Sequence, residues 1–100
     1  MKIKIGINGM GRIGRMILRS IFEGNKDIEI KHINNRTNSE TCSTLLKYDS
    51  IHGKFKANIS FDEKNLIVNK TKISFSQETD INKINWKKYG VDYVFECTGK

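Results

Sequence analysis

The sequence has no proline, only two cysteines in 100 residues, and no apolar run long enough to cross a membrane. A spanning helix needs about 20 predominantly apolar residues. Cys42 and Cys97 are too few and too far apart in sequence for a disulfide framework or a zinc site. The chain enters an apolar segment almost at once, which argues against a signal peptide. We therefore expect one domain at most, in a reducing, cytoplasmic setting, with no metal site and no membrane contact.

The chain is basic, with 18 Lys and Arg against 11 Asp and Glu and a formal net charge of +7. Such a balance can indicate a nucleic-acid partner when the basic residues cluster. Here they are scattered along the sequence, and the one basic and aromatic run, Lys87-Lys88-Tyr89, is short enough to be a solvated helix end. Nucleic acid is therefore an unlikely partner, whereas a positive field would attract a phosphorylated cofactor or substrate.

A glycine-rich turn near the N-terminus is the most informative motif. An apolar segment ending at Asn8 is followed by Gly9-x-Gly11-x-x-Gly14 and then by a helical pattern. This is the fingerprint of a dinucleotide-binding βαβ unit. Gly9 would allow a tight turn, Gly11 would let a pyrophosphate approach the backbone, and Gly14 would let the helix pack close to the sheet. The sequence therefore predicts a dinucleotide site at this turn.

The helix after the turn is expected over residues 12–23, with Gly24 ending it. The N–H groups of Arg12 and Ile13 would lie at the positive end of its dipole and bind the phosphates. We expect Arg15 and Arg19 to face away from the sheet. The predicted apolar face consists of residues at helical spacing: Ile13, Ile17 and Ile21, with Gly14, Leu18 and Phe22 beside them.

A second parallel strand is predicted over residues 28–33, and its end bears on the choice of cofactor. About 20 residues after the glycine turn, an NAD-specific unit places an Asp or Glu on the adenosine ribose. Here the chain has Asn34, Asn35 and Arg36 instead. Loss of the carboxylate and a neighbouring guanidinium favour a 2′-phosphate, and so NADP or dual use over NAD alone. The alternative is that Arg36 is simply a solvated side chain.

The rest of the chain predicts a mixture of elements. We expect a helix over 39–47 capped by Asn38 or Ser39, a loop over 48–55, and a short helix within 80–89 that ends at Gly90. His52, a lone histidine in that loop, is interpreted as structural. Short strands near 59–61, 66–68 and 73–75 are expected to form a small antiparallel excursion from the main sheet.

A third buried strand of the main sheet is predicted over residues 91–95. Ligands of open α/β sheets bind at the carboxyl ends of the strands, so Thr98 and Gly99 are candidates to line the cofactor site. Cys97 is interpreted as a small buried residue. The predicted fold class is α/β: a Rossmann-type parallel sheet with helices on its faces, a small antiparallel β excursion, and an incomplete, truncated domain over residues 1–100.

Three segments carry a resemblance to a known family. They are residues 7–15, residues 45–55 (LLKYDSIHGKF) and residues 96–99 (ECTG). In this order and spacing, the chain resembles the N-terminal, coenzyme-binding part of glyceraldehyde-3-phosphate dehydrogenase. Erythrose-4-phosphate dehydrogenase is similar over the same segments, and a nucleotide-binding module without catalysis is a further alternative.

The resemblance implies a cytoplasmic homotetramer that oxidises a sugar-phosphate aldehyde with NAD(P) and forms an acyl phosphate. It also implies roles for individual residues. Asn35 takes the place of the family's ribose-binding Asp, and Thr79 takes the place of a basic residue near the adenine. The residues expected to bind the cofactor are Asn8, Gly9, Met10, Gly11, Arg12, Ile13, Asn35, Arg36, Thr79, Thr98 and Gly99.

No catalytic residue is expected within the chain. The family's nucleophilic cysteine and general-base histidine lie beyond residue 100, and neither Cys42 nor Cys97 has the surrounding sequence of that nucleophile. We therefore expect that these residues alone give no dehydrogenase turnover, and that the chain is a fragment of the enzyme.

Overall fold

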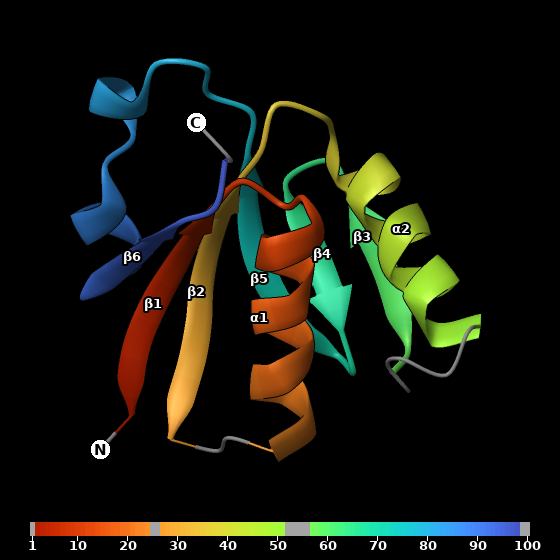
Figure 1. Ribbon diagram of the computed structural model, residues 1–100. Helices are drawn as coiled ribbons and strands as arrows, with labels where there is room; N and C mark the ends of the chain where they lie inside the picture. The colour runs from red at the N-terminus through yellow and green to blue at the C-terminus, as the bar shows by residue number, and fades with distance from the viewer. Residues whose placement is uncertain (1, 25–26, 52–56, 99–100) are drawn as a thin grey trace.

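The computed structural model describes residues 2–24, 27–51 and 57–98. The elements follow one another as shown in Figure 1: β1 (Ile3–Asn8), α1 (Arg12–Gly24), β2 (Ile28–Asn34), α2 (Ser39–Ile51), β3 (Ile59–Asp62), β4 (Asn65–Val68), β5 (Thr71–Ser76), the 3₁₀ helices η1 (Ile81–Lys83) and η2 (Trp86–Tyr89), and β6 (Tyr93–Glu96). The predicted bounds of α1 and β2 differ from these by one residue each. No helix in the described ranges is long and apolar enough to cross a membrane.

The strands form one six-stranded sheet in the order β3-β4-β5-β2-β1-β6. β1 pairs in parallel with both β2 and β6, and β5 pairs in parallel with β2. β3 and β4 are antiparallel, and β4 is antiparallel to β5. The predicted antiparallel excursion is therefore present, but it is not separate from the main sheet. β5 belongs to both parts, because one edge of this strand pairs with β2 and the other with β4.

α1 covers one face of the sheet (Figure 1), and its buried residues are Gly14 and Leu18. Leu18 is fully buried, and a Cβ built on Gly14 would overlap the carbonyl oxygen of Gly9 and touch Ile7. The expectation that Gly14 permits close packing is thus confirmed. Ile13, predicted on the apolar face, is instead 54% exposed. It lies in the first turn of the helix.

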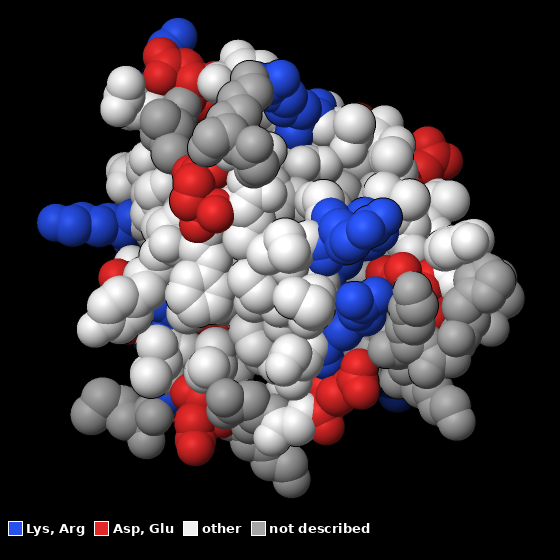
Figure 2. Space-filling view, viewed as in Figure 1, with Lys and Arg blue, Asp and Glu red and all other residues white. Residues whose placement is uncertain are grey.

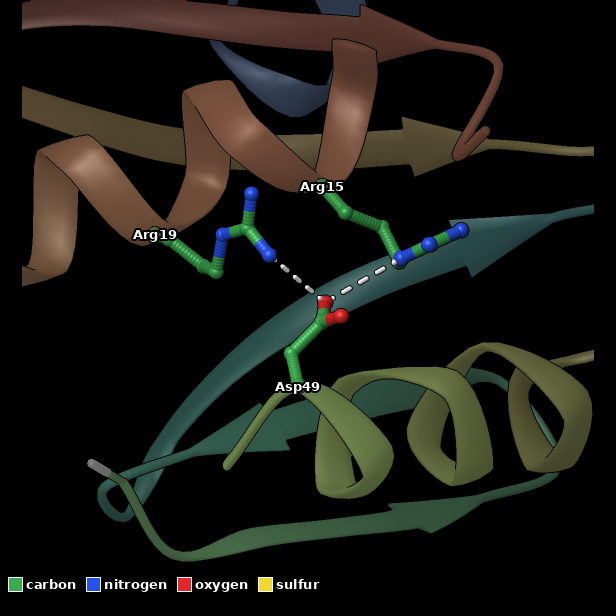
Figure 3. A network of polar contacts seen from close by, with 3 residues as sticks. All are labelled: Arg15, Arg19 and Asp49. Atoms are coloured by element: carbon green, nitrogen blue, oxygen red, sulfur yellow. Dashed lines mark hydrogen bonds and ion pairs between the residues drawn. The ribbon is translucent and has the colours of Figure 1, made fainter. Parts of the chain in front are cut away.

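α2 is longer than predicted, and Asp49 in the additional turn binds two arginines of α1. Residues 48–51, predicted to be in a loop, continue the helix. Asp49 of α2 accepts two ion pairs on its Oδ2, from Arg15 Nε at 3.2 Å and Arg19 Nη1 at 3.0 Å (Figure 3). The sequence predicted that both arginines face away from the sheet, and it gave no indication that they join α1 to α2. At the start of α2, Asn38 is the cap, because its Oδ1 accepts from Thr41 N–H at 2.9 Å.

The opposite face of the sheet is covered by η2. A Cβ built on Gly6 of β1 would lie 2.5 Å from the Trp86 ring. His32 of β2 stacks on Tyr89 with ring centroids 3.7 Å apart. Burial lowers the pKa of His32 to about 4, so the ring is neutral near pH 7. The short helix predicted over 80–89 is in fact two 3₁₀ turns, and Gly90, with φ of 79°, ends the second as expected.

β6 is an edge strand rather than the buried strand that was predicted. Tyr93 is 64% exposed, and Val94 and Phe95 are also exposed. Of the described strands, only β1 pairs with it.

On the face drawn in Figure 2, basic side chains lie in separate groups with acidic side chains between them.

Candidate functional site

A pocket of about 550 Å³ lies where the parallel strands end. The carboxyl ends of β1, β2, β5 and β6 meet at this edge of the sheet (Figure 1). This is the position where open α/β sheets bind ligands. The lining residues come from these strand ends and the loops that follow: Asn8, Gly9, Gly11, Asn34, Asn35, Arg36, Thr37, Glu78, Thr79, Glu96, Cys97 and Thr98.

The glycine turn forms one wall of this pocket. Gly9 has a φ of 100°, which side chains rarely adopt, and a Cβ there would come within 2.8 Å of the Cys97 backbone. A Cβ at Gly11 would meet nothing within 4 Å. The space over Gly11 is therefore open next to the N-terminus of α1, where unpaired N–H groups favour an anion. These residues fit a dinucleotide pyrophosphate.

Asn35 lies behind the glycine turn and is held by three contacts. Its Oδ1 accepts from Met10 N–H at 3.0 Å, and its Nδ2 donates to Thr37 Oγ1 at 2.7 Å and to Cys42 Sγ at 3.3 Å. The Met10 side chain is buried in the core. The neutral amide of Asn35 therefore supports the turn, and the guanidinium of Arg36 stands beside it in the lining with no carboxylate at this strand end.

The last residues of four parallel strands form a row of polar side chains at this edge of the sheet, and three of them, Asn8, Asn34 and Glu96, line the pocket. Asn34 Nδ2 donates to Asn8 Oδ1, and Asn8 Nδ2 donates to Glu96 Oε2, both at 2.9 Å. On the other side, Ser76 Oγ donates to Asn34 Oδ1 at 2.6 Å. The hydrogen bond from Asn8 holds the pKa of the Glu96 carboxyl below its usual range, against a smaller opposing effect of burial. Glu96 is thus an anion at neutral pH.

The two cysteines show no sign of activation. Burial raises the pKa of the Cys42 thiol, and two hydrogen bonds from Asn35 and Thr37 oppose this only in part. The pKa of the Cys97 thiol is also raised, first by burial and then by the Glu96 carboxylate. Both thiols stay protonated near pH 7 and are not poised as nucleophiles. Cys42 is buried, whereas Cys97, which was predicted to be buried, is only partly so.

Seven of the predicted cofactor residues line the pocket: Asn8, Gly9, Gly11, Asn35, Arg36, Thr79 and Thr98. Three others, Met10, Arg12 and Ile13, lie in the turn and first helical residues but not in this lining. Gly99 and His52 lie outside the described residues. Sequence reasoning did not select Asn34, Thr37, Glu78 or Glu96 as site residues. A usable signal existed for Asn34 and Glu96, since each is a polar residue that ends an apolar strand of a parallel sheet.

Comparisons with known proteins agree along the length of the chain. The family model described as glyceraldehyde 3-phosphate dehydrogenase, NAD binding domain, matches residues 3–100. The glyceraldehyde-3-phosphate dehydrogenase of Thermotoga maritima is 46% identical over 97 residues, which is 96% of this chain and 29% of that protein. The enzyme of Geobacillus stearothermophilus is 44% identical over 100 residues, covering 100% of this chain and 30% of that enzyme.

Glyceraldehyde-3-phosphate dehydrogenase 1 of Bacillus subtilis is 44% identical over 99 residues, which is 99% of this chain and 29% of that protein. The chain therefore spans less than a third of the length of these relatives. The pocket at the strand ends, the open glycine turn and the match over nearly every residue lead to one conclusion. The chain belongs to the family of glyceraldehyde 3-phosphate dehydrogenase NAD-binding domains.

Proposed function

We propose that these residues form the cofactor-binding part of a phosphorylating glyceraldehyde-3-phosphate dehydrogenase that uses NAD and also accepts NADP. The observation that carries the proposal is the pocket of about 550 Å³ at the carboxyl ends of β1, β2, β5 and β6. Its glycine turn has room for a pyrophosphate, and the matching relatives bear the name of this enzyme.

In this proposal, each wall of the pocket holds one part of the cofactor. The open backbone at Gly11 and the N–H groups of Arg12 and Ile13 bind the pyrophosphate. Asn35 and Arg36 lie beside the adenosine ribose, and Thr79 lies at the adenine. Asn8 and Thr98 line the floor on the side of β6. The bound dinucleotide supplies a nicotinamide that accepts hydride, and the residues of this chain bind and orient it.

The tolerance for NADP rests on the end of β2. Asn35 is neutral and already engaged with Met10, Thr37 and Cys42, so no carboxylate repels a 2′-phosphate there. Arg36 is exposed beside it and can pair with a phosphate. Two acidic residues, Glu78 and Glu96, also line the pocket and act against the binding of a phosphate. The electrostatic field in the pocket is therefore not uniformly positive.

The test uses the full-length gene product, meaning these residues with any sequence that adjoins them in the gene. The affinities for NAD and NADP are measured by titration calorimetry, beside an Asn35→Asp, Arg36→Leu double variant. We expect the wild type to bind both cofactors and the variant to lose NADP affinity by about 10- to 100-fold, the effect of removing one charge partner and adding a repelling carboxylate.

Asn35→Asp alone and Arg36→Leu alone separate the two effects. If the wild type binds NAD only and Arg36→Leu changes nothing, Arg36 is a solvated side chain and the dual use is wrong. If neither dinucleotide binds, the proposed function itself is wrong. Phosphate-dependent oxidation of glyceraldehyde 3-phosphate by the same preparation tests the reaction.

We further propose, on the family resemblance, that the full-length gene product is a cytoplasmic homotetramer and that residues 1–100 are an incomplete Rossmann domain of it. Light scattering coupled to size-exclusion chromatography measures the assembly directly. A mass corresponding to a monomer or dimer at micromolar concentration would contradict the tetramer.

A further inference from the structure

The row of polar side chains at the strand ends is set by the register of the sheet. Asn8 pairs with Asn34 across β1 and β2, Asn34 with Ser76 across β2 and β5, and Asn8 with Glu96 across β1 and β6. Paired residues of neighbouring parallel strands point to the same face, about 5 Å apart. Four short polar side chains can therefore join into one chain of hydrogen bonds.

The orientation of every group in the row follows from one backbone residue. Glu78 N–H donates to Asn34 Oδ1 at 2.8 Å, and Asn34 Nδ2 donates to the Glu78 carbonyl at 2.9 Å. A backbone N–H can only donate and a carbonyl can only accept, so the Asn34 amide cannot be flipped. With Asn8 and Ser76 as its other partners, Asn34 uses its full hydrogen-bonding capacity while only 4% exposed.

The fixed amide of Asn34 then determines its neighbours on both sides. Asn8 Oδ1 must accept from Asn34, so Asn8 Nδ2 is turned to the Glu96 carboxylate. Ser76 must donate to Asn34 Oδ1, so Ser76 Oγ is left to accept from His32 Nε2, which is 2.8 Å away. The donors from Ser76 through Asn34 and Asn8 to the carboxylate thus all point in one direction.

We propose that this aligned chain of hydrogen bonds is a positioning device for the cofactor site, and that Ser76, which does not line the pocket, is a positioning residue within it. The inference rests on the proposed function. Aligned donors that end on an anion strengthen one another. They keep the Glu96 carboxylate bound to Asn8, away from the space for the cofactor phosphates, and they hold the Glu78–Thr79 wall through Asn34.

Ser74 provides a matched control on the same strand. Its hydroxyl donates to the Lys31 carbonyl at 2.9 Å and lies 2.7 Å from the other ring nitrogen of His32, Nδ1, but it takes no part in the row. Both serines are partly buried, and each contacts His32. Ser74→Ala and Ser76→Ala therefore remove comparable hydroxyls from the same imidazole, and only the second breaks the chain to the pocket.

The experiment measures the affinity for NAD in the full-length gene product by titration calorimetry. Ser76→Ala should weaken binding about 3- to 10-fold, the scale of one net hydrogen bond. Ser74→Ala should leave the affinity within twofold of the wild type, and Ser76→Thr, which keeps the hydroxyl, should restore it. Equal affinities in wild type and Ser76→Ala, or equal losses in both alanine variants, would overturn the inference.

A spectroscopic measurement tests the direction of the chain in the wild type itself, even if Ser76→Ala does not fold. Nitrogen chemical shifts of ¹⁵N-labelled histidine should place the proton of His32 on Nε2, where Ser76 accepts it, so that Ser74 donates to Nδ1 in preference to the Lys31 carbonyl. Ser76→Ala should move it to Nδ1, where Ser74 can accept it. A wild-type proton on Nδ1 would overturn the inference. Wild-type protein that binds no dinucleotide would overturn the proposed function and this role with it, whereas a normal wild type with unaffected Ser76→Ala would overturn the role alone.

Discussion

Gly11 and Gly14 belong to the same motif, but glycine is needed at the two positions for different reasons. A Cβ on Gly14 would overlap the Gly9 carbonyl oxygen, which is backbone and cannot move aside cheaply. A Cβ on Gly11 would meet nothing within 4 Å, and Gly11 does not share the positive φ of Gly9. The fold therefore requires Gly14, whereas Gly11 is needed only for a ligand that approaches its backbone.

Alanine substitutions separate these two requirements. Gly14→Ala should destabilise the protein by about 2–4 kcal/mol through forced separation of α1 from the turn. Gly11→Ala should change stability by less than about 1 kcal/mol and weaken NAD binding at least 10-fold, because a methyl group would occupy the space for the pyrophosphate. Chemical denaturation and calorimetry measure the two quantities. Normal NAD affinity in Gly11→Ala would show that the pyrophosphate binds elsewhere.

Asp49 of α2 joins this helix to α1 through ion pairs with Arg15 and Arg19. Its side chain is only 5% exposed, and those of Arg15 and Arg19 are 17% and 16% exposed. One carboxylate oxygen serves both guanidinium groups (Figure 3). Removing the carboxylate would leave two poorly hydrated cations side by side, so the cluster holds the helices together more firmly than an exposed ion pair could.

Asp49→Asn tests this linkage, with an expected loss of about 1–3 kcal/mol in the free energy of unfolding. The control is Glu29→Gln, which removes an ion pair with Lys31 in which both side chains are about one-third exposed. We expect the control to cost less than about 0.5 kcal/mol. Raised salt should reduce any effect of Glu29→Gln and leave most of that of Asp49→Asn. Equal small losses would show that the arginine cluster is solvated.

The sequence predicted the elements that depend on local pattern. β1, α1 and β2 have strong apolar periodicity and glycine or asparagine at their ends. β1 ends at Asn8 as predicted, and the bounds of α1 and β2 are accurate to one residue. The failures depend on distant neighbours. Residues 48–51 lack an obvious helical signal but gain Asp49 contacts to α1, and the pairing of β5 with β2 joins residues more than 40 positions apart.

The site was predicted to a similar extent and for the same reason. The glycine turn and the end of β2 could be found because their spacing is local and has a known mechanism. Asn34 and Glu96 acquire their roles only when four strands come into register, which spacing along the chain does not reveal. The contacts of Arg15 and Arg19 with Asp49 were not predicted, because helical periodicity identifies a face without saying what packs on it.

At the scale of the whole molecule, the two edges of the sheet differ. β3 is the edge strand on one side, and a tight antiparallel hairpin connects it to β4. On the other side, β6 presents Tyr93, Val94 and Phe95, which are 64%, 38% and 37% exposed. An apolar edge strand with free backbone groups is a template for pairing with a second chain.

The 100-residue polypeptide expressed alone should therefore self-associate through β6. Light scattering at increasing concentration measures this, and Tyr93→Lys should raise the concentration at which aggregates appear. Phe61→Lys, at an exposed position of β3, is the control and should have a smaller effect. A polypeptide that stays monomeric at all concentrations and unfolds cooperatively would show that the β6 edge does not cause self-association.

The different neighbours of the three fingerprint glycines also bear on how such motifs change over time. A Cβ at Gly9 would collide with the Cys97 and Thr98 backbone, and one at Gly14 with Gly9 itself, so both glycines are constrained by the protein's own chain. A descendant that lost its ligand would still be under selection to keep these two, and only position 11 would be free to drift. Retention of Gly11 is therefore informative about ligand binding. Gly9 and Gly14 would be retained even in a protein that no longer binds a ligand.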